Sequence, residues 1–335
     1  MIVRNEAHFL KRCLQSVEGL VDEIVIVDTG STDDTVAIAR TCTEKIETFT
    51  WRDDFSAARN YSLALAQGDW ILVLDADEWI EPRHLQQLRE LIATTTLDGF
   101  FLQQRNYSNN ALEPGWMPVS ENNVYTSGFS GFRDNPICRL FRNRPDIRFS
   151  GRVHELVDRC LPTGTFDHLD IPLHHHEDSD PTKPKASRQL VYLALMEKAL
   201  AEDTGAASNP DTGRMAANAG ALTVRHKQDY RLAIRYFERA IELDYQPQEN
   251  REGIAEALYR LGDHAGALKA YRSLYESGYQ SFSLLNNLAN LLVRGGAKKA
   301  AAQLLEQALP MAANVPEVAQ RIEHNIRLLS KEASS

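Results

Sequence analysis

The chain has 335 residues, 43% of them hydrophobic, so it is long enough to bury two cores and predicts two domains. Its net charge of −9 argues against broad nucleic-acid binding, which needs a basic face. No apolar run approaches the length of a membrane span and no signal peptide opens the chain, which favours the cytoplasm. The four cysteines lack the spacing of a metal site, so we expect reduced thiols.

The chain opens on a short apolar segment followed by Asn5 and Glu6. A second predicted strand, residues 23–27, ends at Asp28, and a glycine turn leads into a helix that we expect to begin near Thr35. A capped strand–turn–helix joint of this kind is found in any α/β protein. However, Asp28 stands at the carboxyl end of a strand, the edge at which open α/β sheets bind ligands.

A helix is predicted from Phe55 to about Ala66, preceded by two acidic residues that suit a helix N-terminus. Arg59 lies in its first turns. For this residue alone, a charge on an exposed helix face is the simplest interpretation.

Residues 70–74 form an apolar run that is typical of a buried strand. Asp75 and Asp77 follow where this strand leaves the core, and alternation along an extended chain lets both carboxylates lean to the same side. Two hard oxygen ligands in this position suit Mg²⁺ or Mn²⁺, which can hold phosphate groups. The pattern therefore indicates a nucleotide-sugar site, although Asp-x-Asp also occurs by chance and in turns.

Residues 99–103 and 137–142 are predicted strands. Between them, residues 106–134 are polar and without clear periodicity. A loop of this length is either a functional flap over the active site or disordered.

The pair His154 and Glu155 is a second candidate site. A lone His-Glu pair is more often a surface or structural pair. Here it follows Asp77 by about eighty residues, and Gly151 shortly before it permits a close approach of the backbone.

Three successive histidines, residues 174–176, end another predicted strand. They alternate faces, so one or two of them point inward. By register with Ile171 and Leu173, His175 lies on the inward side. A histidine-rich surface loop is the alternative interpretation.

Beyond residue 180 the pattern changes to helices, and small and large apolar residues recur with a period of 34 residues. The recurring positions are Ala233, Ala267 and Ala301, then Phe237, Tyr271 and Leu305, and then Ala240, Leu274 and Ala308. This spacing is typical of tetratricopeptide repeats. It predicts three copies over 214–315 and a last helix over 316–330, which form a short capped solenoid.

Four segments taken in order, residues 1–6, 22–33, 55–60 and 68–78, resemble family 2 glycosyltransferases of the GT-A fold. The resemblance covers roughly residues 1–176. It is greatest to the bacterial subgroup with tetratricopeptide repeats after the transferase domain, which includes enzymes that glycosylate Cys in bacteriocin peptides. Family members usually carry several residues before the first segment, so the chain begins inside the expected first strand.

The resemblance implies three parts. An α/β GT-A domain, a Rossmann-like mixed sheet with helices on both faces, is expected at 1–180. A helix and linker follow at 181–212, and an all-α repeat solenoid is expected at 213–330.

The resemblance also implies an inverting, metal-dependent glycosyltransferase whose donor is a nucleoside diphosphate sugar, most commonly a UDP-sugar in this family. Asp28 and Arg59 would contact the base, while Asn5 and Glu6 would line the nucleotide pocket. Asp75 would hold the ribose or the metal.

The expected metal is Mn²⁺ or Mg²⁺, held by Asp75, Asp77 and His175, and it would neutralise charge on the leaving diphosphate. Glu155 would be the base that deprotonates the acceptor. His154 would orient this base or touch the diphosphate.

The acceptor is expected to be a protein, a peptide or a glycan, and the repeats would bind it or form a homo-oligomer. The alternative is a repeat-based adaptor with an inactive transferase domain, against which the intact Asp75, Asp77 and Glu155 argue. A nucleotidyltransferase usually needs a glycine-rich basic loop after its first strand, and residues 4–7 do not supply one.

Overall fold

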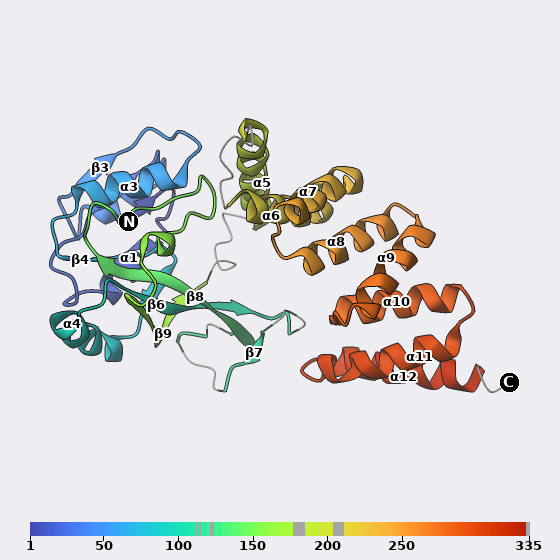
Figure 1. Ribbon diagram of the computed structural model, residues 1–335. Coiled ribbons are helices and arrows are strands. Elements are labelled where there is room, and N and C mark those ends of the chain that lie inside the picture. Colours follow the sequence, from blue (N-terminus) through green and yellow to red (C-terminus); the bar gives the residue numbers. More distant parts are fainter. Residues whose placement is uncertain are drawn as a thin grey trace. The chain divides into compact units, whose positions relative to one another are not determined.

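The chain divides into two compact units, Met1–Lys185 and Ala186–Ser335. The computed structural model describes residues 1–111, 113, 115–120, 124–126, 128–176, 185–203 and 211–332 (Figure 1). Within the expected helix and linker at 181–212, residues 181–184 and 204–210 lie outside the described residues. Among the described residues, no helix is both long and apolar enough to cross a membrane.

The first unit begins with a three-stranded parallel sheet in the order β1 (Ile2–Val3), β2 (Ile26–Asp28) and β3 (Ile46–Thr48). β2 lies in the middle and is wholly buried. Parallel neighbours pair with both of its edges, and successive residues are buried on both faces of the sheet, which explains its apolar sequence before Asp28. Asp28 ends this strand at the carboxyl edge of the sheet.

The second sheet of this unit is mixed and runs in the order β4-β8-β6-β9-β5, with β7 (Met117–Pro118) paired to β8. Its other strands are β4 (Trp70–Leu72), β5 (Glu78–Ile80), β6 (Gly99–Ser108), β8 (Gly131–Arg142) and β9 (Phe166–His175). Only β6 and β9 are parallel among these pairs. The α/β fold predicted from the sequence is confirmed, but the strands form two sheets where the sequence predicted one.

The region from 106 to 134 is more ordered than the predicted loop. β6 continues to Ser108 and β8 begins at Gly131, and these two residues are paired in an antiparallel ribbon (Figure 1). The strands extend because Asn106, Tyr107 and Ser108 can alternate faces in a ribbon without forming an apolar pattern. The prediction of a loop beginning at residue 106 was wrong by a few residues at each end.

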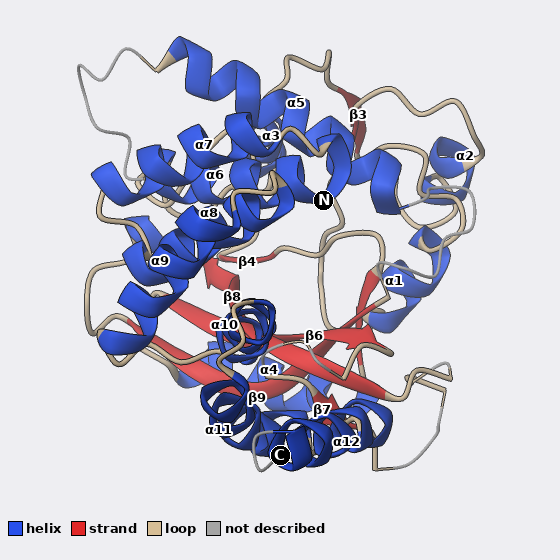
Figure 2. Cartoon of the chain, turned by 90° about the vertical axis from the view of Figure 1, so that its right-hand side faces the viewer, coloured by secondary structure: helices blue, strands red, loops and turns tan. Residues whose placement is uncertain are grey.

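Four helices surround these sheets, and Figure 2 distinguishes them from the strands. They are α1 (Leu10–Ser16), α2 (Thr35–Ala39), α3 (Phe55–Leu65) and α4 (Leu85–Thr94), with short 3₁₀ turns at Pro82–His84 and Asp158–Cys160. α3 begins where the sequence predicted, because the Asp54 carboxylate accepts a hydrogen bond from the amide of Ala57 at 2.9 Å.

The second unit is built from helices that pack in succession along the chain. They are α5 (Lys185–Glu202), α6 (Thr212–Leu222), α7 (Tyr230–Glu242), α8 (Pro247–Arg260), α9 (His264–Glu276), α10 (Phe282–Arg294), α11 (Lys298–Ala308) and α12 (Pro316–Glu332). A π-helical turn, Thr223–Lys227, follows α6, and a 3₁₀ turn, Leu309–Ala312, follows α11. Neighbouring helices from α6 to α12 contact one another.

The 34-residue period has the packing role that the sequence predicts. Ala233, Ala267 and Ala301 are fully buried, and the large residue four positions after each is also buried. Phe237 illustrates the fit, since its ring lies between the backbones of Gly220 and Gly253. The helices of the repeats therefore pack where small residues on one helix leave room for large side chains of the next.

Candidate functional site

The loop after β2 is closed by the Asp28 carboxylate. It accepts hydrogen bonds from the amides of Gly30 at 3.3 Å and Ser31 at 3.1 Å, and Gly30 has a φ of 110°, which only glycine adopts readily. Asp28 is 7% exposed. The residue that the sequence places at the nucleotide base therefore also shapes the turn around it.

Asn5 and Glu6 lie against this same loop. The Asn5 side-chain oxygen accepts from the amide of Thr32 at 2.7 Å, and the amide of Asn5 donates to the Ser31 hydroxyl at 2.9 Å. The amide of Glu6 donates to the hydroxyl of Thr35 at 2.7 Å. These bonds fix the segment after β1 against the segment after β2, so Asn5, Glu6 and Asp28 come together as one polar rim.

Arg59 on α3 connects two residues that are far apart in the sequence. Its Nη2 lies 2.6 Å from Oδ1 of Asp75, and its Nε donates to Oε1 of Glu155. The Arg59 side chain is buried, although the sequence alone favoured an exposed charge on the helix. The candidate base and the first aspartate of the Asp-x-Asp pair therefore share one guanidinium.

Asn60, the next residue, explains the polar sequence in these first turns. Its side-chain amide donates to the carbonyl of Phe149 at 2.9 Å, and its oxygen accepts from the amide of Phe149 at 2.9 Å. The amide of Phe55 donates to the carbonyl of Arg152 at 3.0 Å. The start of α3 thus holds the segment that carries His154 and Glu155.

That segment is a tight loop closed by two backbone hydrogen bonds between Ser150 and Leu156, at 2.9 and 3.0 Å. His154 is exposed on it and has a φ of 54°. Asn5 and Asp53 are likewise non-glycine residues in the left-handed region, with φ of 56° and 57°. Left-handed backbone at such residues is uncommon and concentrates at functional loops.

Arg139 on β8 is a member of this cluster that the sequence did not identify. Its Nη2 lies 2.5 Å from Oδ2 of Asp75 and 2.7 Å from Oε1 of Glu78. Gln104 on β6 donates to the same Oε1 at 2.5 Å, and the amide of Asp75 donates to Oε2 of Glu78 at 2.9 Å. An arginine inside an otherwise apolar strand was the available signal, but its partners depend on strand register.

Burial and charge act in opposite directions on this cluster. Burial disfavours the charge on Asp75, but the guanidinium groups of Arg139 and Arg59 lower its pKa well below the usual range. Burial also opposes the charge on Arg59, whose pKa is nevertheless raised by Asp75 and Glu155. Burial raises the pKa of Glu78, although Arg139 opposes that change.

The side chains of Asp77 and His175 lie beside each other. Oδ2 of Asp77 is 3.3 Å from Nε2 of His175. Nδ1 of His175 is 2.7 Å from the side-chain oxygen of Asn106, whose amide nitrogen donates to the carbonyl of Gln104 at 3.1 Å. The Asn106 oxygen is therefore the atom that faces His175. Burial opposes ionisation of Asp77, but the neighbouring His175 lowers its pKa.

The other two histidines point to the opposite face of β9. His174 stacks on Trp79 with ring centroids 5.9 Å apart and is hydrogen-bonded to Tyr107 at 2.8 Å. His176 meets the same Trp79 ring edge-on at 4.5 Å. Among 174–176, only His175 lies next to Asp77, on the face where the alternation with Ile171 and Leu173 predicted it.

The donor set for a metal is split between two places. Asp77 and His175 lie together, whereas both oxygens of Asp75 contact arginines. Within the part of the chain that the structure describes, no three His, Cys, Asp or Glu side chains form a group that could hold a metal ion by themselves. A Mg²⁺ ion bound with substrate phosphates needs only one or two protein ligands, so Asp77 and His175 fit that requirement.

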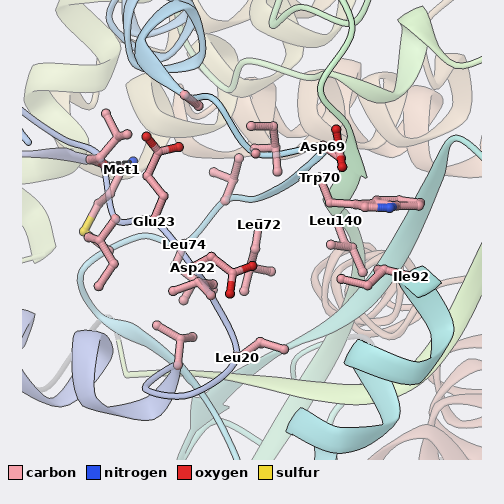
Figure 3. A pocket seen from close by; sticks show the side chains of 18 of the residues that line it. Met1, Leu20, Asp22, Glu23, Asp69, Trp70, Leu72, Leu74, Ile92 and Leu140 are labelled. Carbon is pink, nitrogen blue, oxygen red and sulfur yellow. Dashed lines mark hydrogen bonds between the residues drawn. The ribbon is translucent and has the colours of Figure 1, made fainter.

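A cavity of about 430 Å³ lies elsewhere in the first unit. Figure 3 shows its lining residues, with Met1 and Glu23 at one side of the view and Trp70 at the other. Its lining is largely apolar and includes none of the candidate site residues. All three residues of β4 line the cavity, together with residues from α1, α3 and α4.

Comparison with known proteins gives two family matches. Residues 1–145 match glycosyl transferase family 2, and residues 218–281 and 252–316 match the tetratricopeptide repeat. The two matches fall in the two compact units described above.

Individual relatives agree with this division. The chain is 32% identical over 313 residues to a TPR repeat-containing protein of Synechococcus elongatus, covering 87% of this chain and 68% of that protein. It is 34% identical over 164 residues to an uncharacterized glycosyltransferase of Rickettsia felis, covering 47% of this chain and 58% of the relative. It is 29% identical over 157 residues to the glycosyltransferase SunS of Bacillus subtilis, covering 46% of this chain and 33% of SunS.

Among solved structures, S. aureus TarS 1–349 aligns with a TM-score of 0.42 at 15% identity, over 83% of this chain and 90% of that one. The chain spans only part of the two glycosyltransferases, 58% and 33% of their lengths. The family assignment rests on the sequence matches, which cover both units. The chain therefore carries a family 2 glycosyltransferase domain in its first unit and tetratricopeptide repeats in its second.

Proposed function

We propose that this glycosyltransferase moves a sugar, with inversion and with the help of Mn²⁺ or Mg²⁺, from a nucleoside diphosphate sugar to an acceptor. The donor we favour is a UDP-sugar, and the acceptor a protein, a peptide or a glycan. The observation that carries the proposal is that the transferase unit contains two side-chain pairs. One is Asp77 with His175, and the other is Arg59 with Glu155.

The His175 tautomer supports a cation at Asp77. Because Asn106 presents an oxygen to Nδ1, that nitrogen carries the proton, and Nε2 of a neutral His175 turns its lone pair toward Asp77. Two acceptors 3.3 Å apart repel each other unless a proton or a cation lies between them. Asp77 and His175 would hold the ion through the two atoms that face each other, and the ion would supply the positive charge that keeps them together.

The formal charge of the cluster supports the same proposal. Three carboxylates, Asp75, Glu78 and Glu155, contact two guanidinium groups, and Asp77 beside His175 adds a fourth carboxylate. With His175 neutral, the formal charge of the cluster is −2. A divalent cation would balance that charge and would stabilise the diphosphate as it leaves.

The nucleotide would bind where Asn5, Glu6 and Asp28 form the polar rim, with Arg59 beside it. Nη1 of Arg59 is buried and has no hydrogen-bond partner among the described residues. A buried donor of this kind is costly unless a ligand satisfies it, so Nη1 is suited to an oxygen of the nucleotide.

Glu155 would act as the general base. Its carboxylate takes the proton from the acceptor nucleophile while that atom attacks the anomeric carbon, and the nucleoside diphosphate leaves with the electrons of the broken bond. Arg59 holds Oε1, so Oε2 is the oxygen that would take the proton. His154, exposed on the same loop, would orient Glu155 or touch the diphosphate.

The repeats would bind or position a protein or peptide acceptor, or would mediate self-association. Solenoid surfaces serve both roles. The boundaries that we propose for these parts remain 1–180, 181–212 and 213–330.

A thermal-shift panel of nucleoside diphosphate sugars, each with and without Mn²⁺, tests the proposal. A ligand at about a hundred times its dissociation constant adds about 2.7 kcal/mol of stability, which raises the melting temperature measurably. A shift that requires both the metal and one donor would support the proposal. The absence of a shift with every donor would favour the repeat-based adaptor instead.

The variant Asp77→Ala should abolish metal-dependent turnover. The matched control Asp146→Ala removes an exposed carboxylate of the same unit, which pairs with Arg144, and should leave turnover within about twofold. Activity of Asp77→Ala within a few-fold of the parent enzyme would count against the metal site.

A further inference from the structure

Asp75 is held in a different way from Asp77. One of its carboxylate oxygens contacts Arg59 at 2.6 Å and the other contacts Arg139 at 2.5 Å. Each oxygen therefore already has a cationic partner. Asp77, in contrast, lies beside His175, whose other ring nitrogen is hydrogen-bonded to Asn106.

The backbone of Asp75 is fixed as firmly as its side chain. Its amide donates to Oε2 of Glu78 at 2.9 Å, and its carbonyl accepts from the amide of Glu78 at 3.0 Å and from the thiol of Cys13 at 3.4 Å. Glu78 and Cys13 are fully buried. The Asp75 side chain is 32% exposed, but rotating its carboxylate toward a new ligand would break its contacts with both arginines.

A divalent cation at Asp75 would also lie next to two guanidinium groups. Like charges at this distance in a buried site repel strongly, and both arginines would lose the carboxylate that compensates their own burial. A cation at Asp77 avoids both penalties, because Asp77 contacts no arginine in the described structure.

The contacts of Asp75 lead instead to the candidate base. Arg139 is fixed by Glu78 and holds one side of Asp75, Asp75 holds Nη2 of Arg59, and Nε of Arg59 holds Glu155. Arg59 and Arg139 are 7% and 3% exposed, so neither has room to reorient without the other. This chain runs from β8 through the Asp-x-Asp loop and α3 to the loop of Glu155.

We infer that Asp75 is a positioning residue and not a metal ligand: together with Arg139 it sets the orientation of Arg59, and Arg59 sets that of Glu155. The inference rests on the proposed function and revises the ligand role that the sequence predicts for Asp75. It assigns the two aspartates of the motif to different tasks, one to the metal and one to the base.

Direct measurement of Mn²⁺ binding separates these tasks. Titration of the full chain with Mn²⁺ in the presence of UDP, by calorimetry or by the electron paramagnetic resonance of free Mn²⁺, should give Asp75→Asn an affinity within about threefold of the parent. Asp77→Asn should lose at least thirtyfold. The turnover number of Asp75→Asn should still fall at least tenfold, because the base is misoriented.

The variant Arg139→Gln distinguishes a metal-ligand role of Asp75 from a positioning role, even if Asp75→Asn does not fold. If Asp75 were a ligand, removing a competing guanidinium should tighten Mn²⁺ binding. If Asp75 positions Arg59, Mn²⁺ affinity should stay within about threefold while turnover falls, and Arg139→Lys should restore part of the turnover.

The double variant Asp75→Asn/Arg139→Gln completes the test. Two residues that act through one chain should lose no more turnover together than the worse single variant loses alone. Equal loss of Mn²⁺ affinity in Asp75→Asn and Asp77→Asn, or tighter binding in Arg139→Gln, would overturn the inference and leave the proposed function intact. A parent enzyme that binds neither Mn²⁺ nor UDP would overturn both.

Discussion

Glu155 is the residue on which the chemistry of transfer depends, and Glu155→Gln tests it with little change of shape. The amide can still accept the hydrogen bond from Nε of Arg59 but cannot take a proton. We expect donor binding to stay within about threefold while the turnover number falls by about 10²–10⁴, the usual contribution of a general base. Calorimetric donor titration and steady-state kinetics measure the two effects.

The matched control is Asp158→Asn, since Asp158 lies on the same segment outside the Arg59 network. It should leave both quantities within about twofold. Parallel loss of donor affinity and turnover in Glu155→Gln would assign Glu155 a structural role.

Site residues could be predicted from the sequence where they directly follow a strand. Asp28, Asp75 and Asp77 follow apolar runs, so their place at a sheet edge followed from local pattern alone. Arg139 could not be predicted in this way. Its reach to Asp75 depends on the pairing of Ile71 with Phe141, a register that no local pattern specifies.

At the scale of elements, β9 carries a pH dependence. Burial lowers the pKa of His174 to about 4 and that of His176 to about 4, so both are neutral in the folded protein near pH 6. The unfolded chain binds protons below about pH 6.5. The stability that these histidines contribute is therefore complete above about pH 6.5 and is lost as the pH falls toward 4.

Urea denaturation followed by the fluorescence of the transferase unit should show this as a fall of up to about 1.4 kcal/mol per pH unit for each histidine. His176→Gln should reduce the slope between pH 6.5 and 4. His168→Gln, on an exposed position of the same strand, should not change it. An unchanged slope in His176→Gln would contradict the prediction.

In the repeats, Phe237 contacts two glycines so closely that replacing one of them with alanine should lower stability, although helix propensity alone predicts a gain. Alanine in place of glycine inside a helix normally adds about 1 kcal/mol of stability. At Gly253 the added methyl group would lie 2.7 Å from the Phe237 ring, so Gly253→Ala should lower the unfolding free energy by about 1–3 kcal/mol.

Gly295→Ala is the control, because its nearest neighbour would be a backbone oxygen at 3.6 Å, an ordinary contact. It should change stability by less than about 1 kcal/mol. The double variant Gly253→Ala/Phe237→Leu should recover part of the loss, as urea titration of helical circular dichroism would show. A neutral Gly253→Ala would contradict the tight fit.

At the scale of the whole molecule, all candidate donor-site residues lie in the unit Met1–Lys185. Amide hydrogen exchange with and without Mn²⁺ and the nucleoside diphosphate of the donor should therefore show protection within that unit. Segments 22–33 and 149–156, which carry the polar rim and the Glu155 loop, should gain most. Protection that spreads equally through α6 to α12 would contradict a donor site confined to the first unit.

The order of the two units could be predicted because each has its own sequence period, apolar strand runs before residue 180 and a 34-residue helical repeat after it. The repeat needs only neighbouring helices, so its packing follows from local spacing. The division of the strands into two sheets could not be predicted, because it depends on whether β1 and β4 pair, which joins residues about seventy positions apart.

The left-handed backbone at Asn5, Asp53 and His154 has a consequence for protein engineering. A β-branched residue in this conformation is a steric outlier, and even an unbranched one costs about 1–2 kcal/mol, whereas glycine, asparagine or aspartate accept it. In loop libraries or grafts that randomise these three positions, many variants will be destabilised whatever their effect on activity. A library restricted to glycine, asparagine and aspartate, with histidine kept at position 154, would preserve the backbone of the loops and allow the neighbouring side chains to vary.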